Sequence, residues 1–344
     1  MGTKARRGGS ISCRIDTMTI LVTGGAGYIG SHTVRLLSES GRNVVAFDSM
    51  EFGHRASVGE VSLVEGDIGD AAAVRRAIKE FDIDSVVHFA AYKSPAESMQ
   101  KPERYFENNV AKSAKLIETL HAMGVNRFVF SSTCAVYGTP RGVPVDEDAP
   151  IQPESPYGES KAVTERVLSW FDRCGSLRSV SLRYFNAAGA WADGSIGEDW
   201  TVTINLVPLL MKAALGRRGP LQVFGTDYPT PDGTAIRDYV HVVDLARAHV
   251  RALEYLERGG QSAVLNLGTG VGSSVFEVMA AAERIIGQPV PHELAPRRPG
   301  DPVALFADNQ RAKDLLGWIP EAGLDEILRS AWIWHSSHPD GYKD

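Results

Sequence analysis

The sequence predicts an α/β fold, a doubly wound parallel sheet followed by a smaller mixed α/β lobe. In the first half of the chain, short runs rich in Val, Ile and Phe alternate with longer helical patterns. The runs lack polar alternation, which is typical of strands buried on both faces. Because strands and helices alternate, a parallel sheet with right-handed crossovers is favoured.

The elements of this sheet can be placed in chain order. Strands are expected at residues 19–23, 43–47, 61–64, 85–89, 127–130 and 179–182. Helices are expected between them at residues 29–40, 71–81, 103–123 and 157–174. The third helix has Pro102 at its first position and Gly124 after its last turn, as the preferences of helix ends predict.

The pattern loosens after about residue 185, where segments containing Gly and Pro interrupt shorter elements. We therefore expect a first domain over residues 18–185 and a ligand-binding lobe over residues 186–344. Part of the second half, residues 236–257, is expected to pack back on the first domain. Residues 1–17 are basic without an apolar run, which predicts a disordered extension rather than a signal peptide.

Composition excludes several classes of function. With 344 residues, 43% hydrophobic and 23% charged, the chain can build a full core. A net charge of −6 argues against nucleic-acid or membrane-surface partners. Three scattered cysteines fit a reducing, cytoplasmic location, and nine histidines without metal-ligand spacing predict no metal site. No apolar run is long enough to span a membrane.

A glycine-rich turn, TGGAGYIG at residues 23–30, follows the first strand and opens the first helix. Gly24, Gly27 and Gly30 leave room for a tight turn, a close approach of backbone to pyrophosphate, and close packing of helix on strand. The helix N-terminus presents free N–H groups and a positive dipole end to phosphates. This turn predicts a dinucleotide site in a Rossmann-like domain.

Residues at the ends of the next strands extend this site. Asp48 ends the second strand about 20 residues later, where a ribose-binding acid is expected. A carboxylate there accepts hydrogen bonds from both ribose hydroxyls and repels a 2′-phosphate, so NAD is favoured over NADP. Asp67 can meet the adenine amino group. After the fourth strand come Phe89, Ala90 and Ala91, of which the small residues allow backbone to lie close to a ligand.

A candidate catalytic group lies in the segment YGESK, where Tyr157 and Lys161 project from one face of a helix. A phenol with a pKa near 10 is a poor base at neutral pH, but a neighbouring ammonium and an oxidised nicotinamide both lower that pKa. Because strand ends line the ligand crevice, Thr133 is expected to place its hydroxyl beside Tyr157. Cys134 is interpreted as a packing residue, and His88 and His241 as makers of structural hydrogen bonds.

Several motifs then match a known family in their order along the chain. TGGAGYIGSH, EGDI, HFAAYKS, YFENN, SSTCAVYG, YGESK and RYFNAAGA resemble those of the extended short-chain dehydrogenase/reductases. The later stretches, GTDYPTPDGTAIRDY above all, resemble the UDP-glucose 4-epimerases in particular. The resemblance covers roughly residues 18–335.

The resemblance implies roles for individual residues: Tyr157 as the base, Lys161 on the nicotinamide ribose and Thr133 as a hydroxyl relay. It implies further cofactor contacts at Tyr28, Ile29, Ile68, Lys93, Asn108, Ser131, Tyr184 and Phe185. It implies UDP-sugar contacts at Asn186, Asn205, Leu206, Phe224, Arg237, Tyr239, Arg298, Asp301 and Leu305. Arginine suits a diphosphate, and a phenylalanine face suits uracil.

The implied function is an NAD-dependent UDP-glucose/UDP-galactose 4-epimerase. Transient oxidation at C4, rotation of the 4-keto sugar and return of the hydride would invert that carbon. Leu305 is bulky, which predicts a preference for these hexoses over N-acetylhexosamines, while UDP-pentoses stay open. The resemblance also implies a homodimer through the helices at 103–123 and 157–174.

Two other classes have weaker support. A nucleotide-sugar dehydratase needs an added acid–base pair after the motif threonine, whereas Cys134 and Ala135 stand there. A non-catalytic NAD-binding sensor is disfavoured because Tyr157 and Lys161 are both present. One departure from the family follows Asp48, where Ser49-Met50-Glu51-Phe52 replaces an asparagine-rich turn. The contacts of that turn stay open.

Overall fold

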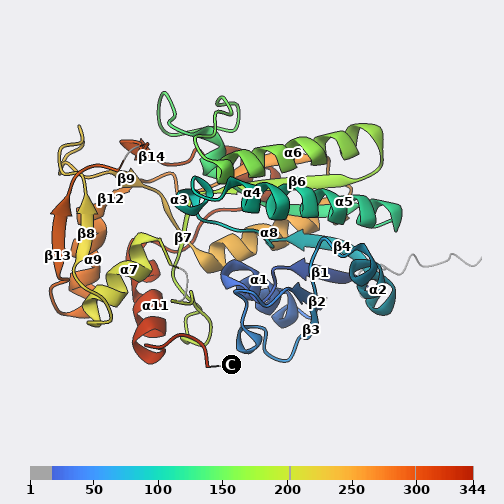
Figure 1. The fold of residues 1–344 in the computed structure, drawn as a ribbon, viewed down its shortest axis with the longest axis horizontal. Helices are drawn as coiled ribbons and strands as arrows, with labels where there is room; N and C mark the ends of the chain where they lie inside the picture. Colours follow the sequence, from blue (N-terminus) through green and yellow to red (C-terminus); the bar gives the residue numbers. More distant parts are fainter. Residues whose placement is uncertain (1–17, 201–202, 299, 344) are drawn as a thin grey trace, which may run out of the picture.

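A computed structural model of the chain describes residues 18–200, 203–298 and 300–343, so the expectation for residues 1–17 lies outside the described residues. Figure 1 shows two lobes side by side, the larger built on one sheet and the smaller carrying α7, α9 and α11. None of the helices within the described ranges is long and apolar enough to cross a membrane.

Seven strands form the central sheet, in the order β11-β6-β5-β4-β1-β2-β3. Each pairs in parallel with its neighbours. The strands are β1 (Thr19–Thr23), β2 (Asn43–Asp48), β3 (Ser62–Glu65), β4 (Ile83–His88), β5 (Arg127–Thr133), β6 (Arg178–Tyr184) and β11 (Ala263–Leu267). The predicted doubly wound parallel sheet is confirmed.

Helices cover both faces of this sheet because neighbouring residues of each strand point in opposite directions. Leu21 of β1 lies in a core with α2 (Ala71–Phe81), α5 (Ser113–Ala122) and α6 (Pro156–Cys174). Its neighbours Ile20 and Val22 lie in a second core with α1 (Tyr28–Glu39) and α8 (Val242–Glu257). The strand ends between these layers form one edge, where α1 and α6 begin.

The helix expected over residues 103–123 exists, but its interior differs from a regular α-helix. It consists of α4 (Pro102–Tyr105), a wider π-helical stretch η2 (Phe106–Lys112) and α5. In the wide stretch, the carbonyl of Asn109 accepts a hydrogen bond from the Thr164 hydroxyl at 3.0 Å. Such stretches frequently occur at functional sites. The helix α3 (Pro95–Ser98) precedes α4.

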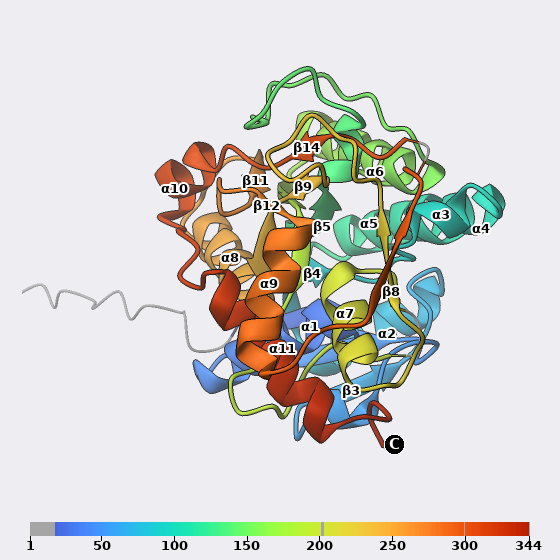
Figure 2. The same ribbon diagram turned by 90° about the vertical axis from the view of Figure 1, so that its left-hand side faces the viewer.

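Within the described residues, the second lobe is built from short strands and three helices, and it faces the viewer in Figure 2. Its strands are β7 (Asn186–Ala188), β8 (Leu221–Phe224), β9 (Ile236–Arg237), β10 (Tyr239–His241), β12 (Ser273–Ser274), β13 (His292–Ala295) and β14 (Ala304–Leu305). Its helices are α7 (Leu206–Ala214), α9 (Val275–Ile286) and α11 (Leu324–Ser337), whereas α10 (Gln310–Leu316) packs against α8 and β11 of the larger lobe. The short 3₁₀ turns η1 (Arg55–Ser57) and η3 (Cys134–Tyr137) lie in the first lobe.

The chain crosses between the lobes more than once. After β10, α8 packs against α1, β5 and β6, and β11 then joins the edge of the central sheet beside β6. Sequence reasoning did not foresee the strand at β11. Residues 186–344 therefore supply both the smaller lobe and the last strand of the larger sheet.

Candidate active site

The glycine-rich turn forms a close-packed cradle between β1, α1 and the end of β4. A Cβ atom added to Gly24, which has φ +70°, would lie 2.6 Å from the Ala90 nitrogen. One added to Gly30 would lie 2.0 Å from the Gly24 carbonyl oxygen. At Gly27, no described side chain caps the N-terminus of α1. These features fit a dinucleotide pyrophosphate, which would approach the backbone and accept the helix N–H groups.

Asp48 lies at the end of β2 beside this cradle. Its two carboxylate oxygens accept hydrogen bonds from the Ala26 N–H at 3.0 Å and the Met50 N–H at 2.9 Å. Burial raises the pKa of Asp48, while these backbone hydrogen bonds act in the opposite direction. Its place at the strand end is the one expected for a ribose-binding acid.

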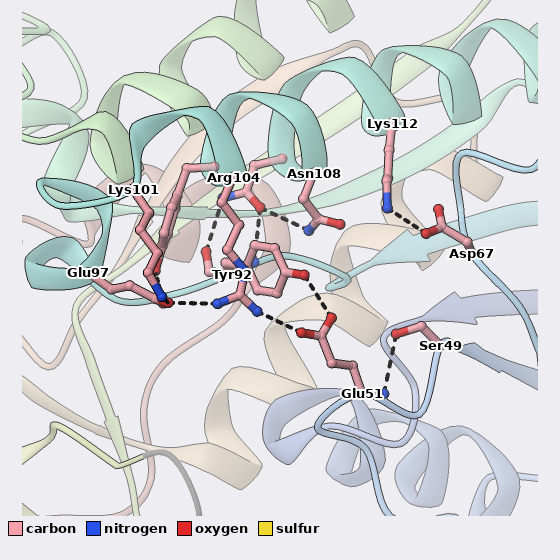
Figure 3. A network of polar contacts seen from close by, with 11 residues as sticks. Ser49, Glu51, Asp67, Tyr92, Glu97, Lys101, Arg104, Asn108 and Lys112 are labelled. Carbon is pink, nitrogen blue, oxygen red and sulfur yellow. Dashed lines mark hydrogen bonds and ion pairs between the residues drawn. The ribbon is translucent and has the colours of Figure 1, made fainter.

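The other two residues expected at the adenine end, Ile68 and Asp67, differ in burial and in their existing contacts. Ile68 is buried in the core beneath α2 and α5. The carboxylate of Asp67 accepts hydrogen bonds from the Gly69 N–H at 2.7 Å and from the Lys112 amine at 2.5 Å. Figure 3 shows this pair reaching from the loop after β3 to the helix η2. A nucleotide base would share Asp67 with Lys112.

Tyr157 and Lys161 lie in the first turns of α6, where both are buried against the end of β5. The Lys161 amine donates to the Ser131 carbonyl at 2.8 Å and lies 4.9 Å from the centre of the Phe130 ring. Burial lowers the pKa of Lys161 to about 7, and nearby Glu165 acts in the opposite direction.

The environment of Tyr157 favours the neutral phenol. Burial raises its pKa well above 10, Tyr184 raises it further, and a hydrogen bond with Thr133 lowers it. The sequence argument expected a neighbouring ammonium to lower this pKa. Desolvation is the largest effect on both Tyr157 and Lys161 and opposes the charged form of each, so it raises the pKa of the phenol.

The ends of β5 and β6 supply the neighbours of this pair. The hydroxyls of Ser131 and Tyr184 lie 2.8 Å apart, and the Thr133 hydroxyl accepts a hydrogen bond from the Ala135 N–H at 3.2 Å. Burial raises the pKa of the Cys134 thiol to about 12, which fits a packing role.

Both singled-out histidines make structural hydrogen bonds. His88 lies 2.6 Å from the Thr23 hydroxyl and 3.1 Å from the Ser113 hydroxyl. His241 lies 3.0 Å from the Ser330 hydroxyl and accepts the Val243 N–H at the start of α8. Burial lowers the pKa of His88 to about 3, so it remains neutral.

A cavity of about 760 Å³, open to solvent, lies in the second lobe, lined by residues of β7, α7, β8, β9 and β10. Eight of the nine expected UDP-sugar residues line it: Asn186, Asn205, Leu206, Phe224, Arg237, Tyr239, Arg298 and Asp301. Its wall includes the start of α7, whose N-terminal N–H groups add to the positive field of the arginines. The cavity thus combines cationic and aromatic groups suited to a nucleoside diphosphate.

The charged groups of the cavity already interact with one another. Arg237 forms an ion pair and hydrogen bond with Asp301. The Arg298 guanidinium lies 4.5 Å from the centre of the Phe224 ring and 3.9 Å from the Asp301 carboxylate. Arg298 therefore covers the aromatic face on which we expected uracil to stack, so a stacked base would displace or share it.

Leu305 is the expected residue that does not line the cavity. It is 9% exposed and lies in a small core with Val136, Tyr137 and Phe185. Its backbone is in register with Arg237 across the β9–β14 pair. The same core includes Ala162 of α6, so the Leu305 side chain packs toward that helix and not into the cavity.

Sequence reasoning missed Glu198, which joins the two halves of the site. Its carboxylate is 3% exposed, lies 2.9 Å from the Lys93 amine and accepts a longer contact of 3.5 Å from the Asn205 amide. It also missed Asn109, whose side chain binds the Tyr92 backbone and the Ser160 hydroxyl, next to Asn108. A lone Glu in IGEDW carries no spacing that would have indicated this role.

Comparison with known sequences identifies the relatives of this chain. A sequence model of the NAD-dependent epimerase/dehydratase family matches residues 20–268. The UDP-glucose 4-epimerase of Lacticaseibacillus casei is 46% identical, over 95% of this chain and 99% of that protein.

Solved structures extend the likeness to three dimensions. One is the UDP-glucose 4-epimerase of Stenotrophomonas maltophila with bound NAD and formylated UDP-arabinopyranose. It is 41% identical and has a TM-score of 0.91 over 94% of this chain and 99% of that one. The enzyme of Brucella ovis in complex with NAD is 42% identical, with a TM-score of 0.90 over 92% and 97%. This chain belongs to the NAD-dependent epimerase/dehydratase family.

Proposed function

We propose that this protein is an NAD-dependent UDP-glucose 4-epimerase that interconverts UDP-glucose and UDP-galactose. The observation that carries the proposal is the meeting of Tyr157, Lys161 and Thr133 at the same edge of the parallel sheet as the glycine cradle, together with the second-lobe cavity lined by the expected UDP-sugar residues. A hydride-transfer cofactor in the cradle and a UDP-sugar in the cavity would meet at this point.

Bound NAD supplies the acceptor and donor of the C4 hydride. Tyr157 is placed to take the proton of the sugar's 4-hydroxyl and to return it after inversion, with Thr133 as its hydrogen-bond partner. Burial raises the pKa of Tyr157, and positive charge bound beside it would favour the basic form. Lys161, held by the Ser131 carbonyl, is placed to orient a ribose.

Inversion requires that the nucleotide be held firmly while the hexose turns. Arg237 and Arg298 supply charge-assisted hydrogen bonds for the diphosphate, and Asn186 and Asn205 supply neutral ones. With the nucleotide anchored by these groups, the 4-keto ring would turn about its link to the diphosphate and present its other face.

The alternatives differ in what they require of single residues. A dehydratase needs an acid after Thr133, but Cys134 and Ala135 open the η3 turn there. UDP-N-acetylhexosamines need space beside the hexose, and the resemblance implies that the bulky Leu305 borders that space. UDP-pentoses lack the group that would clash, so they are the second candidate substrates.

We also propose that the protein is a cytoplasmic homodimer. Exposed apolar side chains lie on the helices that would form the interface, with Phe106 and Trp170 exposed by 40% and 60%. Cys134 and Cys174 are free thiols, which suits a reducing compartment. Sedimentation at several concentrations tests the dimer.

The function is tested by incubating the purified protein with UDP-galactose, without added cofactor, and following UDP-glucose by NMR. We expect UDP-glucose to form without net production of NADH, because each cycle regenerates NAD. Failure to convert UDP-galactose even after NAD is added, with turnover of UDP-pentoses instead, would move the assignment to the second candidate.

A further inference from the structure

The turn after β2 departs from its family's pattern, and the structure shows what the departing residues do. The Tyr92 hydroxyl donates to one carboxylate oxygen of Glu51 at 2.7 Å, and Arg104 donates to the other at 2.6 Å. The Arg104 guanidinium lies 4.0 Å from the centre of the Tyr92 ring. Figure 3 shows these three side chains, called the clasp below, spanning the space between the β2 turn and α4.

Both sides of the clasp are anchored. On one side, the Asn109 side chain holds the Tyr92 backbone through hydrogen bonds of 2.9 Å and 3.0 Å, and Arg104 also donates to Glu97 at 2.6 Å. On the other side, Met50 adopts a left-handed conformation with φ 61°, and its N–H donates to Asp48 at 2.9 Å. The conformation of the turn thus directs Glu51 away from Asp48 toward α4.

The clasp crosses the expected path of the cofactor. Glu51 follows Asp48, the expected ribose acid, by three residues, and Tyr92 directly follows Ala91, where backbone is expected to lie against the dinucleotide. Asp48 and Ala90 lie on opposite sides of the glycine turn, because β1 pairs with β2 on one side and with β4 on the other. The clasp therefore links segments on the two sides of the expected cofactor site.

We infer that Glu51, Tyr92 and Arg104 form a gate that slows the exchange of NAD. The inference rests on the proposed placement of NAD in this cleft. Both carboxylate oxygens of Glu51 accept hydrogen bonds, so the gate is closed in this structure, and the proposal is that it also closes over bound NAD. A gate of this kind slows binding and release by the same factor and leaves affinity unchanged, whereas a direct ligand contact changes affinity.

The expected change in the rate of NAD exchange follows from the solvent exposure of the clasp side chains. The side chains of Glu51 and Arg104 are 45% and 29% exposed, so their pairing is partly screened by solvent. Opening such a network accelerates exchange by roughly threefold to tenfold. Because exposed ion pairs weaken with salt, exchange in the wild-type protein should also accelerate at high ionic strength.

The test uses NADH as a fluorescent probe on the full-length protein. NADH-loaded protein is mixed with excess NAD to measure the dissociation rate, and a separate titration gives the Kd. E51Q and Y92F should release NADH about threefold to tenfold faster than wild type, with Kd unchanged and little further acceleration by salt. R284Q, which removes an exposed ion pair with Asp325 in the second lobe, is the matched control and should behave as wild type.

Each contrary outcome has a distinct meaning. Unchanged NADH release from a folded, epimerase-active E51Q protein overturns the gate alone. A raised Kd with an unchanged association rate also overturns it, because Glu51 would then be an ordinary ligand contact. Wild-type protein that binds no NADH would overturn the cofactor placement together with the gate.

Discussion

Replacing Lys161 with methionine should abolish epimerase activity and make the nucleotide-free protein more stable. Burial lowers the pKa of Lys161 from 10.5 to about 7. At about 1.4 kcal/mol per pH unit, this lowered pKa destabilises the folded protein relative to the unfolded chain by roughly 4 kcal/mol at pH 7. The variant loses the hydrogen bond to the Ser131 carbonyl, which costs about 1–3 kcal/mol. The net gain in unfolding free energy is therefore about 2 kcal/mol.

The pH dependence of stability separates the effect of the Lys161 charge from the loss of its hydrogen bond to Ser131. The folded pKa is below the unfolded one, so between about pH 7 and 10.5 the unfolded chain holds a proton that the folded protein has released. Wild-type stability should therefore rise with pH in this window, by about 2 kcal/mol more than that of K161M between pH 7 and pH 9. The measurement is urea denaturation of both proteins, free of nucleotide, at the two pH values.

An exposed lysine in the last turn of α2 gives the matched control, K79M, which should follow the wild-type curve. Parallel stability curves for wild type and K161M would refute the reasoning about burial. In the same preparations, turnover of UDP-galactose by K161M should fall by about 10²–10⁴-fold. Turnover near the wild-type value would refute the assignment of Lys161 to the reaction.

Three further substitutions test other parts of the site. Y157F should lower kcat by at least about 10²-fold without loss of bound NAD, and wild-type turnover in a coupled assay would contradict its role as base. R237Q should raise the KM for UDP-galactose by about tenfold or more with a smaller change in kcat, as initial rates over a range of substrate would report. L305A should improve kcat/KM for UDP-N-acetylglucosamine relative to UDP-galactose and cost about 2–4 kcal/mol of stability; an unchanged ratio would count against Leu305 as the limiting side chain.

The sheet was predictable because its strands are buried on both faces and are therefore continuous apolar runs. The predicted start of β5 at Arg127 is that of the structure, but its end was placed too early, at residue 130 instead of Thr133. The last residues are polar and resemble a loop, yet they pair with β6 through Thr133 and Tyr184. Long-range pairing decides that boundary, and a single sequence does not display it.

The second lobe was harder to predict from the sequence for the same reason. Strands of two residues, such as β9 and β14, carry no period, and only their register against each other defines them. The cavity joins Asn205 to Arg298 across more than half of the lobe's sequence, which spacing alone could not anticipate. Those residues were reached through the resemblance to a family, whereas the glycine turn and the pair in YGESK were reached from their chemistry.

The pKa shifts of Tyr157 and Lys161 have one main cause, the burial of both side chains. Desolvation opposes the charged form of each, so it raises the pKa of Tyr157 and lowers that of Lys161. Burial therefore disfavours a phenolate–ammonium pair, although the two residues share one helix face. An oxidised nicotinamide held beside Tyr157 would add positive charge and favour the phenolate, and loss of that charge on reduction would favour the phenol. Under the proposed function, the proton affinity of Tyr157 would then follow the oxidation state of the cofactor, which is the coupling that a reversible oxidation at C4 needs.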